Sequence, residues 1–126
     1  MNINEKELNS VLKLPSSKRY EYFIKKICDW EEVWTLYNEG FATISDDEGN
    51  ILVPFWPAKR YAEFFANEEW AGYKPEMIVL DDFIDKWLPG MLKDGYKPAI
   101  FWNSHNSAVT KIENLLRDIE EELENY

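Results

Sequence analysis

The sequence predicts an α+β fold in which a mostly antiparallel sheet of about five strands is covered by helices. Apolar side chains recur at helical spacing near both ends of the chain, whereas aromatic and β-branched runs separated by turns fill residues 33–56. The predicted order of elements is α-α-β-β-β-α-β-α-β-α. We expect one domain over residues 1–126, because domains commonly contain about 100–150 residues.

Two helices are predicted at the N-terminus. Asn4 suits a helix N-cap, and Glu7, three residues later, suits the reciprocal position of a capping box. Pro15 ends this helix, and apolar residues between positions 20 and 28 then form one face of a second helix. The opposite face of that second helix is basic and is expected to lie in solvent; it carries Lys18, Arg19, Lys25 and Lys26.

A three-stranded antiparallel meander is predicted from VWTLY, FATIS and ILVPFW, because polar turns containing glycine separate these runs. Pro54 lacks the N–H that a ladder needs, so the third strand is expected at an edge or a bulge there. Pro57 suits the first turn of a helix that extends to Trp70. Tyr61, Phe64 and Phe65 are expected to face the core.

The second half of the chain alternates strands and helices. A short strand at 77–80 is followed by a helix that Pro89-Gly90 is expected to break, and the last strand covers 99–102. The final helix carries an apolar stripe over only about two heptads, fewer than an independent coiled coil needs. We therefore expect this stripe to pack on the domain's own sheet and the protein to be a monomer rather than a homodimer.

The charge and the short apolar runs of the chain disfavour several classes of partner. Its 14 basic and 24 acidic residues give a net charge of −10, which disfavours binding to a nucleic-acid backbone. Residues 29–57 contain seven acidic residues and no basic one. Apolar runs are too short to span a bilayer, and the charged N-terminus does not have the form of a signal peptide, so no membrane partner and a cytoplasmic location are expected.

Chemistry-bearing motifs are scarce. Cys28 is the only cysteine and His105 the only histidine, and a buried thiol and an ordinary loop histidine are favoured over catalytic roles. The acidic run Asp46, Asp47 and Glu48 lacks the spacing of an EF-hand and is expected to be a solvated turn. Phosphate-binding loops and Cys/His metal clusters are absent from the sequence, so no metal and no cofactor are predicted.

One group of residues remains as a candidate binding site. An arginine near several indoles can hold a carboxylate or stack on a ring, which favours a pocket for a small molecule or a peptide. The alternative is that the charged members form the outer face of a surface helix. The residues of this candidate site are Trp34, Trp56, Lys59, Arg60, Glu63 and Trp70.

Four tryptophan-rich or acidic motifs connect the chain with a known family. They are DWEEVWTLY at 29–37, PFWPAKRYAE at 54–63, EWAGYKPE at 69–76 and LDDFIDKWLPGM at 80–91. With these motifs the chain resembles the bacterial family named domain of unknown function 2750 over nearly its whole length. The resemblance implies a bacterial, cytosolic, single-domain α+β protein, and it supplies no catalytic residues.

Two functions are consistent with these features. The first is a non-enzymatic interaction module that meets a more basic protein with its acidic surface and aromatic rim, because complementary charge speeds encounter and aromatic side chains anchor an interface. A protein that neutralises a basic toxin is one version of this function, by analogy only. The second is a small-molecule or peptide binding protein, or an enzyme of unrecognised type, with the aromatic and arginine pocket.

Overall fold

The computed structural model describes residues 3–68, 70–103 and 106–126 and confirms the α+β class. The helices are α1 (Glu5–Leu12), α2 (Ser16–Trp30), α3 (Lys59–Ala66), α4 (Leu80–Asp82), η1 (Phe83–Trp87), α5 (Leu88–Asp94) and α6 (Ile112–Leu123). The strands are β1 (Glu32–Tyr37), β2 (Ile44–Ser45), β3 (Ile51–Phe55), β4 (Lys74–Val79), β5 (Lys97–Ile100) and β6 (Ala108–Val109). Among the described residues, no helix is both long enough and apolar enough to span a bilayer.

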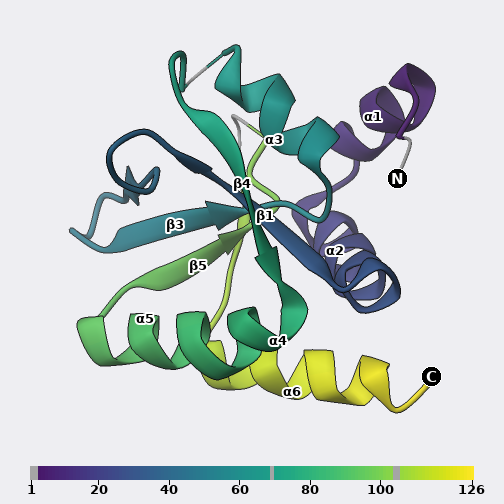
Figure 1. Cartoon of the computed structure of the whole chain (residues 1–126), viewed down its shortest axis with the longest axis vertical. Coiled ribbons are helices and arrows are strands. Elements are labelled where there is room, and N and C mark those ends of the chain that lie inside the picture. The colour runs from purple at the N-terminus through teal and green to yellow at the C-terminus, as the bar shows by residue number, and fades with distance from the viewer. Residues whose placement is uncertain (1–2, 69, 104–105) are drawn as a thin grey trace.

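The strands form two sheets that cross near the centre of the molecule (Figure 1). In the first sheet β1 pairs with β4, antiparallel, and in the second the order is β2-β3-β5-β6. In this second sheet β3 and β5 are parallel, whereas β2–β3 and β5–β6 are antiparallel. One bridge joins the sheets: the backbones of Trp34 and Trp56 exchange two N–H···O bonds, both of 2.8 Å.

The predicted meander is wrong at its first pairing. β1 pairs along its whole length with the distant strand β4, and it meets the next segment of the chain only at the Tyr37–Phe41 bridge. The β1–β4 register places Val33 opposite Ile78, and both are buried. A local turn signal shows that the chain reverses, but it does not show which strand pairs with β1. Burial of the Val33–Ile78 pair favours β4 over the next segment of the chain.

Pro54 lies at a local edge within an interior strand. β2 pairs only with Ile51 and Leu52, so at Pro54 the ladder continues on the β5 side alone, opposite Ala99. On the open side the Thr35 hydroxyl donates to the Pro54 carbonyl at 2.8 Å. The predicted edge position is therefore confirmed for this residue, although β3 as a whole is not an edge strand.

The predicted break at Pro89-Gly90 is wrong, because α4, η1 and α5 form one continuous helix, called the composite helix below. The η1 segment is a π-helical turn in which the Leu88 N–H bonds to the Phe83 carbonyl, five residues earlier. Proline has no N–H, and its ring crowds the carbonyl four residues before it, so a wider turn lets the helix pass through Pro89. The helix ends at Gly95, which has a left-handed φ of 80°.

The core lies between the sheets and the helices and is rich in aromatic side chains. The apolar stripe of α6 is buried in it at Ile112, Leu115 and Ile119, where it packs on α2 and α5. The largest buried side chains are Trp56, Arg19, Tyr61, Phe23, Phe55, Phe65, Phe83 and Phe101. The final helix thus packs on its own chain as expected, but on helices rather than on the sheet.

Two side chains of α2 with polar groups, Cys28 and Arg19, are buried in the core. Cys28 is buried, and burial raises the pKa of its thiol to about 11, which keeps it protonated at neutral pH. Arg19 was expected in solvent but is only 1% exposed. It donates to the carbonyls of Leu14, Phe101 and Asn106, and these bonds compensate the guanidinium for the water it loses on burial.

Candidate functional site

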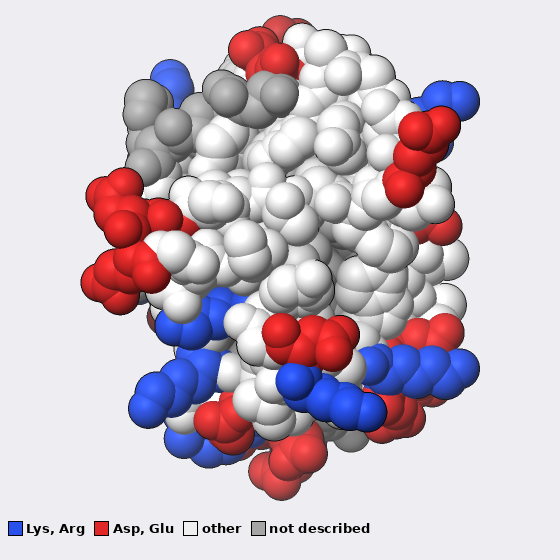
Figure 2. Space-filling view, turned by 90° about the vertical axis from the view of Figure 1, so that its left-hand side faces the viewer, with Lys and Arg blue, Asp and Glu red and all other residues white. Residues whose placement is uncertain are grey.

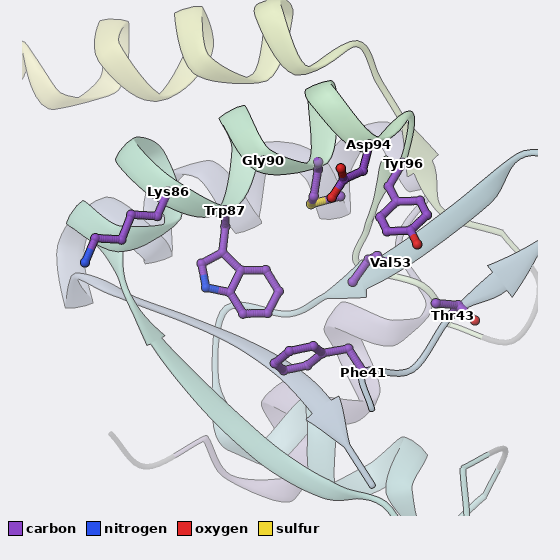
Figure 3. A pocket seen from close by; sticks show the side chains of 9 residues that line it. Phe41, Thr43, Val53, Lys86, Trp87, Gly90, Asp94 and Tyr96 are labelled. Atoms are coloured by element: carbon purple, nitrogen blue, oxygen red, sulfur yellow. The ribbon is translucent and has the colours of Figure 1, made fainter. Parts of the chain in front are cut away.

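A pocket of about 490 Å³ lies between the composite helix and the segment that leads from β1 into β2 (Figure 3). Segments that are far apart in the sequence meet here, because the parallel β3–β5 pairing brings β3 under α5 and the residues that follow it. The lining residues are Phe41, Thr43, Val53, Lys86, Trp87, Gly90, Met91, Asp94 and Tyr96.

Aromatic rings form much of the pocket wall. The rings of Phe41 and Trp87 meet edge to face with centroids 4.6 Å apart. The ring of Trp87 also meets the buried ring of Phe55 edge to face, with centroids 6.0 Å apart. Trp87 is therefore fixed by the core, whereas Phe41 is 39% exposed and Tyr96 is 41% exposed. Exposed rings held next to a concavity are typical of binding surfaces.

The composite helix contributes a glycine and two charged residues to the lining of the pocket. A Cβ built on Gly90 would meet nothing within 4 Å, so this glycine leaves open space in the wall. Asp94 stands at the same end of the pocket as Tyr96, while Lys86 extends away at the other end (Figure 3). The Lys86 Nζ lies 3.5 Å from the Asp82 carboxylate, whereas Asp94 has no ion pair with any described residue. The pocket therefore combines aromatic walls with an unpaired carboxylate.

One side of the molecule carries a broad uncharged area (Figure 2). Figure 2 looks at the side of the molecule where Figure 1 shows the β2–β3 turn and the C-terminal end of α5, and a broad uncharged area covers its upper and central part. Asp and Glu residues stand at its upper and side margins, and below, where α5 and α6 lie, Lys and Arg residues are mixed with further Asp and Glu residues.

Comparison with known protein families shows which family the chain matches. The family described as "Protein of unknown function (DUF2750)" matches residues 20–119, from α2 to α6. The chain belongs to the DUF2750 family. The comparison with curated proteins found no match. Every residue that lines the pocket lies within the matched region, so the pocket belongs to the part of the chain that the family shares.

The tryptophans of the predicted site form part of the core of this DUF2750 protein. Trp56 is 0% exposed, stacks on Phe65 with centroids 5.6 Å apart, and donates its indole N–H to the Trp102 carbonyl at 3.0 Å. Trp70 is half-buried and meets both Trp56 and Trp102 edge to face. Trp34 is also half-buried, and its indole N–H donates to Glu32 at 3.3 Å. The structure brings these indoles together but leaves Trp56 no surface for a ligand.

The charged members of the predicted site lie on the outer surface of α3. Lys59, Arg60 and Glu63 are exposed, while the opposite face of the same helix buries Tyr61 and Phe65. None of the three charged residues lines the pocket of Figure 3. Their placement agrees with the alternative that they form the outer face of a surface helix.

The acidic run forms the turn between β2 and β3, and its three members differ in role. The Asp46 carboxylate accepts bonds from the backbone N–H groups of Glu48 and Asn50, and from the Asn50 side chain at 2.8 Å. These bonds hold a turn in which Gly49 adopts a φ of 84°. Asp47 and Glu48 are exposed. Asp46 therefore builds the turn, and Asp47 and Glu48 project from it.

The bonds to Asp46 predict a measurable pKa. The side-chain and backbone hydrogen bonds from Asn50 lower the pKa of Asp46 below its ordinary value, because they stabilise the carboxylate. Asn50→Ala should raise this pKa toward the ordinary value, as measured by a two-dimensional NMR titration of the carboxyl carbon. Since a lowered pKa stabilises the fold only while the group is ionised, the turn should loosen as the pH falls through the pKa of Asp46. An unchanged pKa in Asn50→Ala would show that the side-chain bond does not form in solution.

The sequence did not single out the residues that line the pocket. Phe41 was placed in a strand and Trp87 in the core, and nothing local shows that Asp94 and Tyr96 approach Val53. One usable signal was Gly90 inside a helix, where glycine costs about 1 kcal/mol relative to alanine and often has a packing or functional reason. His105, which sequence reasoning placed in an ordinary loop, lies outside the described residues.

Proposed function

We propose that this protein is a non-enzymatic binding module that recognises a basic partner protein by receiving an arginine or lysine side chain in the pocket of Figure 3. The observation that carries the proposal is the unpaired Asp94 carboxylate beside aromatic walls, in a chain of net charge −10. A partner that neutralises this charge would be a basic protein, and a basic toxin is one such class, by analogy alone.

The pocket suits the two parts of a long cationic side chain. The rings of Phe41 and Trp87 offer faces for the aliphatic stem and for cation–π contact, which contributes about 0.5–2 kcal/mol. Asp94 offers a carboxylate for a charge-assisted hydrogen bond. Because Lys86 is paired with Asp82, its charge opposes an incoming cation less than a free lysine would. The pocket therefore favours a cation with an apolar stem over an anion.

The acidic turn assists the same partner from a distance. Asp47 and Glu48 project from the β2–β3 turn without building it, and they add to the negative charge of the molecule. Exposed charges of this kind mainly raise the association rate, and added salt screens them. Binding of the basic partner should therefore be faster at low salt.

The test uses a defined probe rather than an unknown partner. N-acetyl-arginine methylamide should shift the backbone NMR resonances of Thr43 and Tyr96 in a saturable manner, and the neutral norleucine analogue should bind at least fivefold more weakly. Gly90→Leu should abolish the shifts, because a side chain at this position enters the open space of the wall. Leu92→Ala, on the exposed side of the same helix, is the matched control and should bind like the wild type.

Co-purification from the native host then asks whether the same surface captures a protein. A basic protein retained by the wild type and by Leu92→Ala but not by Gly90→Leu would support the proposed function. Equal binding of the arginine and norleucine probes, or binding that survives Gly90→Leu, would contradict it.

A second candidate function is binding of a neutral small molecule in the same pocket. Its volume of about 490 Å³ falls within the range of about 300–1,000 Å³ found for ligand sites. A thermal-shift screen separates the two candidates: a neutral compound that raises the melting temperature of the wild type but not of Gly90→Leu would favour the small molecule.

A further inference from the structure

We propose that a second pocket, between α1, α2 and α3, binds a small organic carboxylate. This pocket has a volume of about 560 Å³, and its central feature is the buried guanidinium of Arg19. The lining residues are Leu12, Lys13, Leu14, Pro15, Arg19, Phe64, Phe65, Asn103 and Asn106. The site is separate from the pocket of Figure 3, with which it shares no residue.

Arg19 is a buried cation without a carboxylate partner in the described part of the chain. Its Nε donates to the Phe101 carbonyl at 2.9 Å, and one terminal nitrogen donates to the Leu14 carbonyl at 2.5 Å. The other terminal nitrogen donates to the carbonyl and to the side-chain oxygen of Asn106. These four bonds satisfy four of the five N–H groups of a guanidinium but bring no negative charge to it. An uncompensated buried charge costs free energy, so the field of Arg19 favours an anion held in the pocket beside it.

The charge of the lining distinguishes this pocket within an acidic protein. Lys13 is exposed at its surface and Arg19 is buried in its wall, and among the residues that the structure describes none that lines it is acidic. Four other surface pockets each contain at least one carboxylate, from Asp94, Asp118, Glu113 or the pair Glu31 and Asp81. Because the charged residues in its described lining are both cationic, in a chain with 24 acidic and 14 basic residues, the pocket favours an anionic ligand.

The remaining wall determines the kind of anion. Leu12, Leu14 and Phe64 give the pocket an apolar side that a bare inorganic ion would leave unused. The carbonyl oxygens of Leu12 and Leu14, which would otherwise repel an anion, already accept bonds from Asn103 and Arg19. An apolar body with one carboxylate matches both parts of the wall. Residues 12–19 precede the segment that the family matches, so this site adds to what the family shares.

The test compares three probes by NMR: benzoate, the neutral benzyl alcohol, and inorganic phosphate. Benzoate should shift the Arg19 Nε–H resonance and the backbone resonance of Phe64 in a saturable manner. Benzyl alcohol and phosphate should each bind at least fivefold more weakly, because one lacks the charge and the other lacks the apolar body. Phosphate binding as tight as that of benzoate would overturn the assignment to an organic anion.

Charge reversal at the surface of the pocket provides the matched variants. Lys13→Glu places a negative charge beside the ligand and should weaken benzoate at least fivefold, and its exposed position leaves the fold intact. Lys93→Glu makes the same change of net charge on the composite helix and should bind benzoate like the wild type. The proposal is overturned if benzoate gives no saturable shift, or if both variants weaken it equally.

Discussion

Trp56→Ala should lower the free energy of unfolding by about 4 kcal/mol, within the range of about 3–5 kcal/mol found when a buried large aromatic residue is truncated. Trp56 has no exposed surface, and its ring stacks on Phe65 and meets Trp70 edge to face. Alanine would leave a cavity at the bridge between the two sheets and would free the Trp102 carbonyl, which accepts the indole N–H at 3.0 Å. This single change therefore weakens packing and a buried hydrogen bond together.

Urea denaturation followed by circular dichroism measures this loss. Tyr126→Ala is the control, because Tyr126 is 65% exposed and its truncation should change the free energy by less than about 0.5 kcal/mol. If Trp56→Ala does not fold, Trp56→Phe keeps a ring at this position and should lose about 1–2 kcal/mol through the missing N–H and the smaller volume. A loss below about 1 kcal/mol in Trp56→Ala would show that this residue is not central to the core.

Arg19→Met should lower the free energy of unfolding by about 3 kcal/mol. Methionine fills much of the same space, but it leaves the carbonyls of Leu14, Phe101 and Asn106 without the donor they share. A buried acceptor left without a partner costs about 1–3 kcal/mol. The Phe101 carbonyl is buried, whereas the bonds to Leu14 and Asn106 are part-buried and contribute less each. Removing the desolvated charge offsets part of this cost. The loss should appear as a lower urea midpoint with an unchanged slope.

Arg19→Lys separates charge from geometry. Lysine keeps the positive charge but cannot reproduce the planar fork that reaches three segments, so most of the loss should remain. Lys18→Met, at the exposed neighbouring position, is the matched control and should change stability by less than about 0.5 kcal/mol. Full stability in Arg19→Lys would mean that the charge alone, and not the fork, holds these segments together.

Helices were predictable where their signals are local. Asn4 caps α1 as expected, because its side chain accepts the Glu7 N–H at 2.8 Å. The Glu7 carboxylate, however, accepts the Tyr22 hydroxyl at 2.7 Å, so α1 is tied to α2 by a contact that the capping pattern does not encode. Patterns within a few residues thus predict where a helix begins, but not what its side chains reach across the fold.

Strand pairing and the site depended on contacts that the sequence does not display. β1 pairs with β4 rather than with its neighbour along the chain. Arg19 turns inward because acceptors from the preceding linker, at Leu14, and from one distant segment, at Phe101 and Asn106, meet there. The composition showed that the core would be rich in aromatic residues, but not that Trp56 would be buried while Phe41 stays half exposed. Deciding which aromatic residue is buried and which stays exposed requires the tertiary arrangement.

The parallel pairing of β3 with β5 has a consequence for how the chain acquires its structure during synthesis. β3 is made early, but its parallel neighbour ends at Ile100, so one edge of the sheet stays open until that residue has left the ribosome. The β1–β4 pair is likewise assembled from distant segments. Non-local pairings of this kind slow folding and leave apolar strands uncovered for longer. The nascent chain is therefore most exposed to aggregation between the synthesis of Phe55 and that of Ile100.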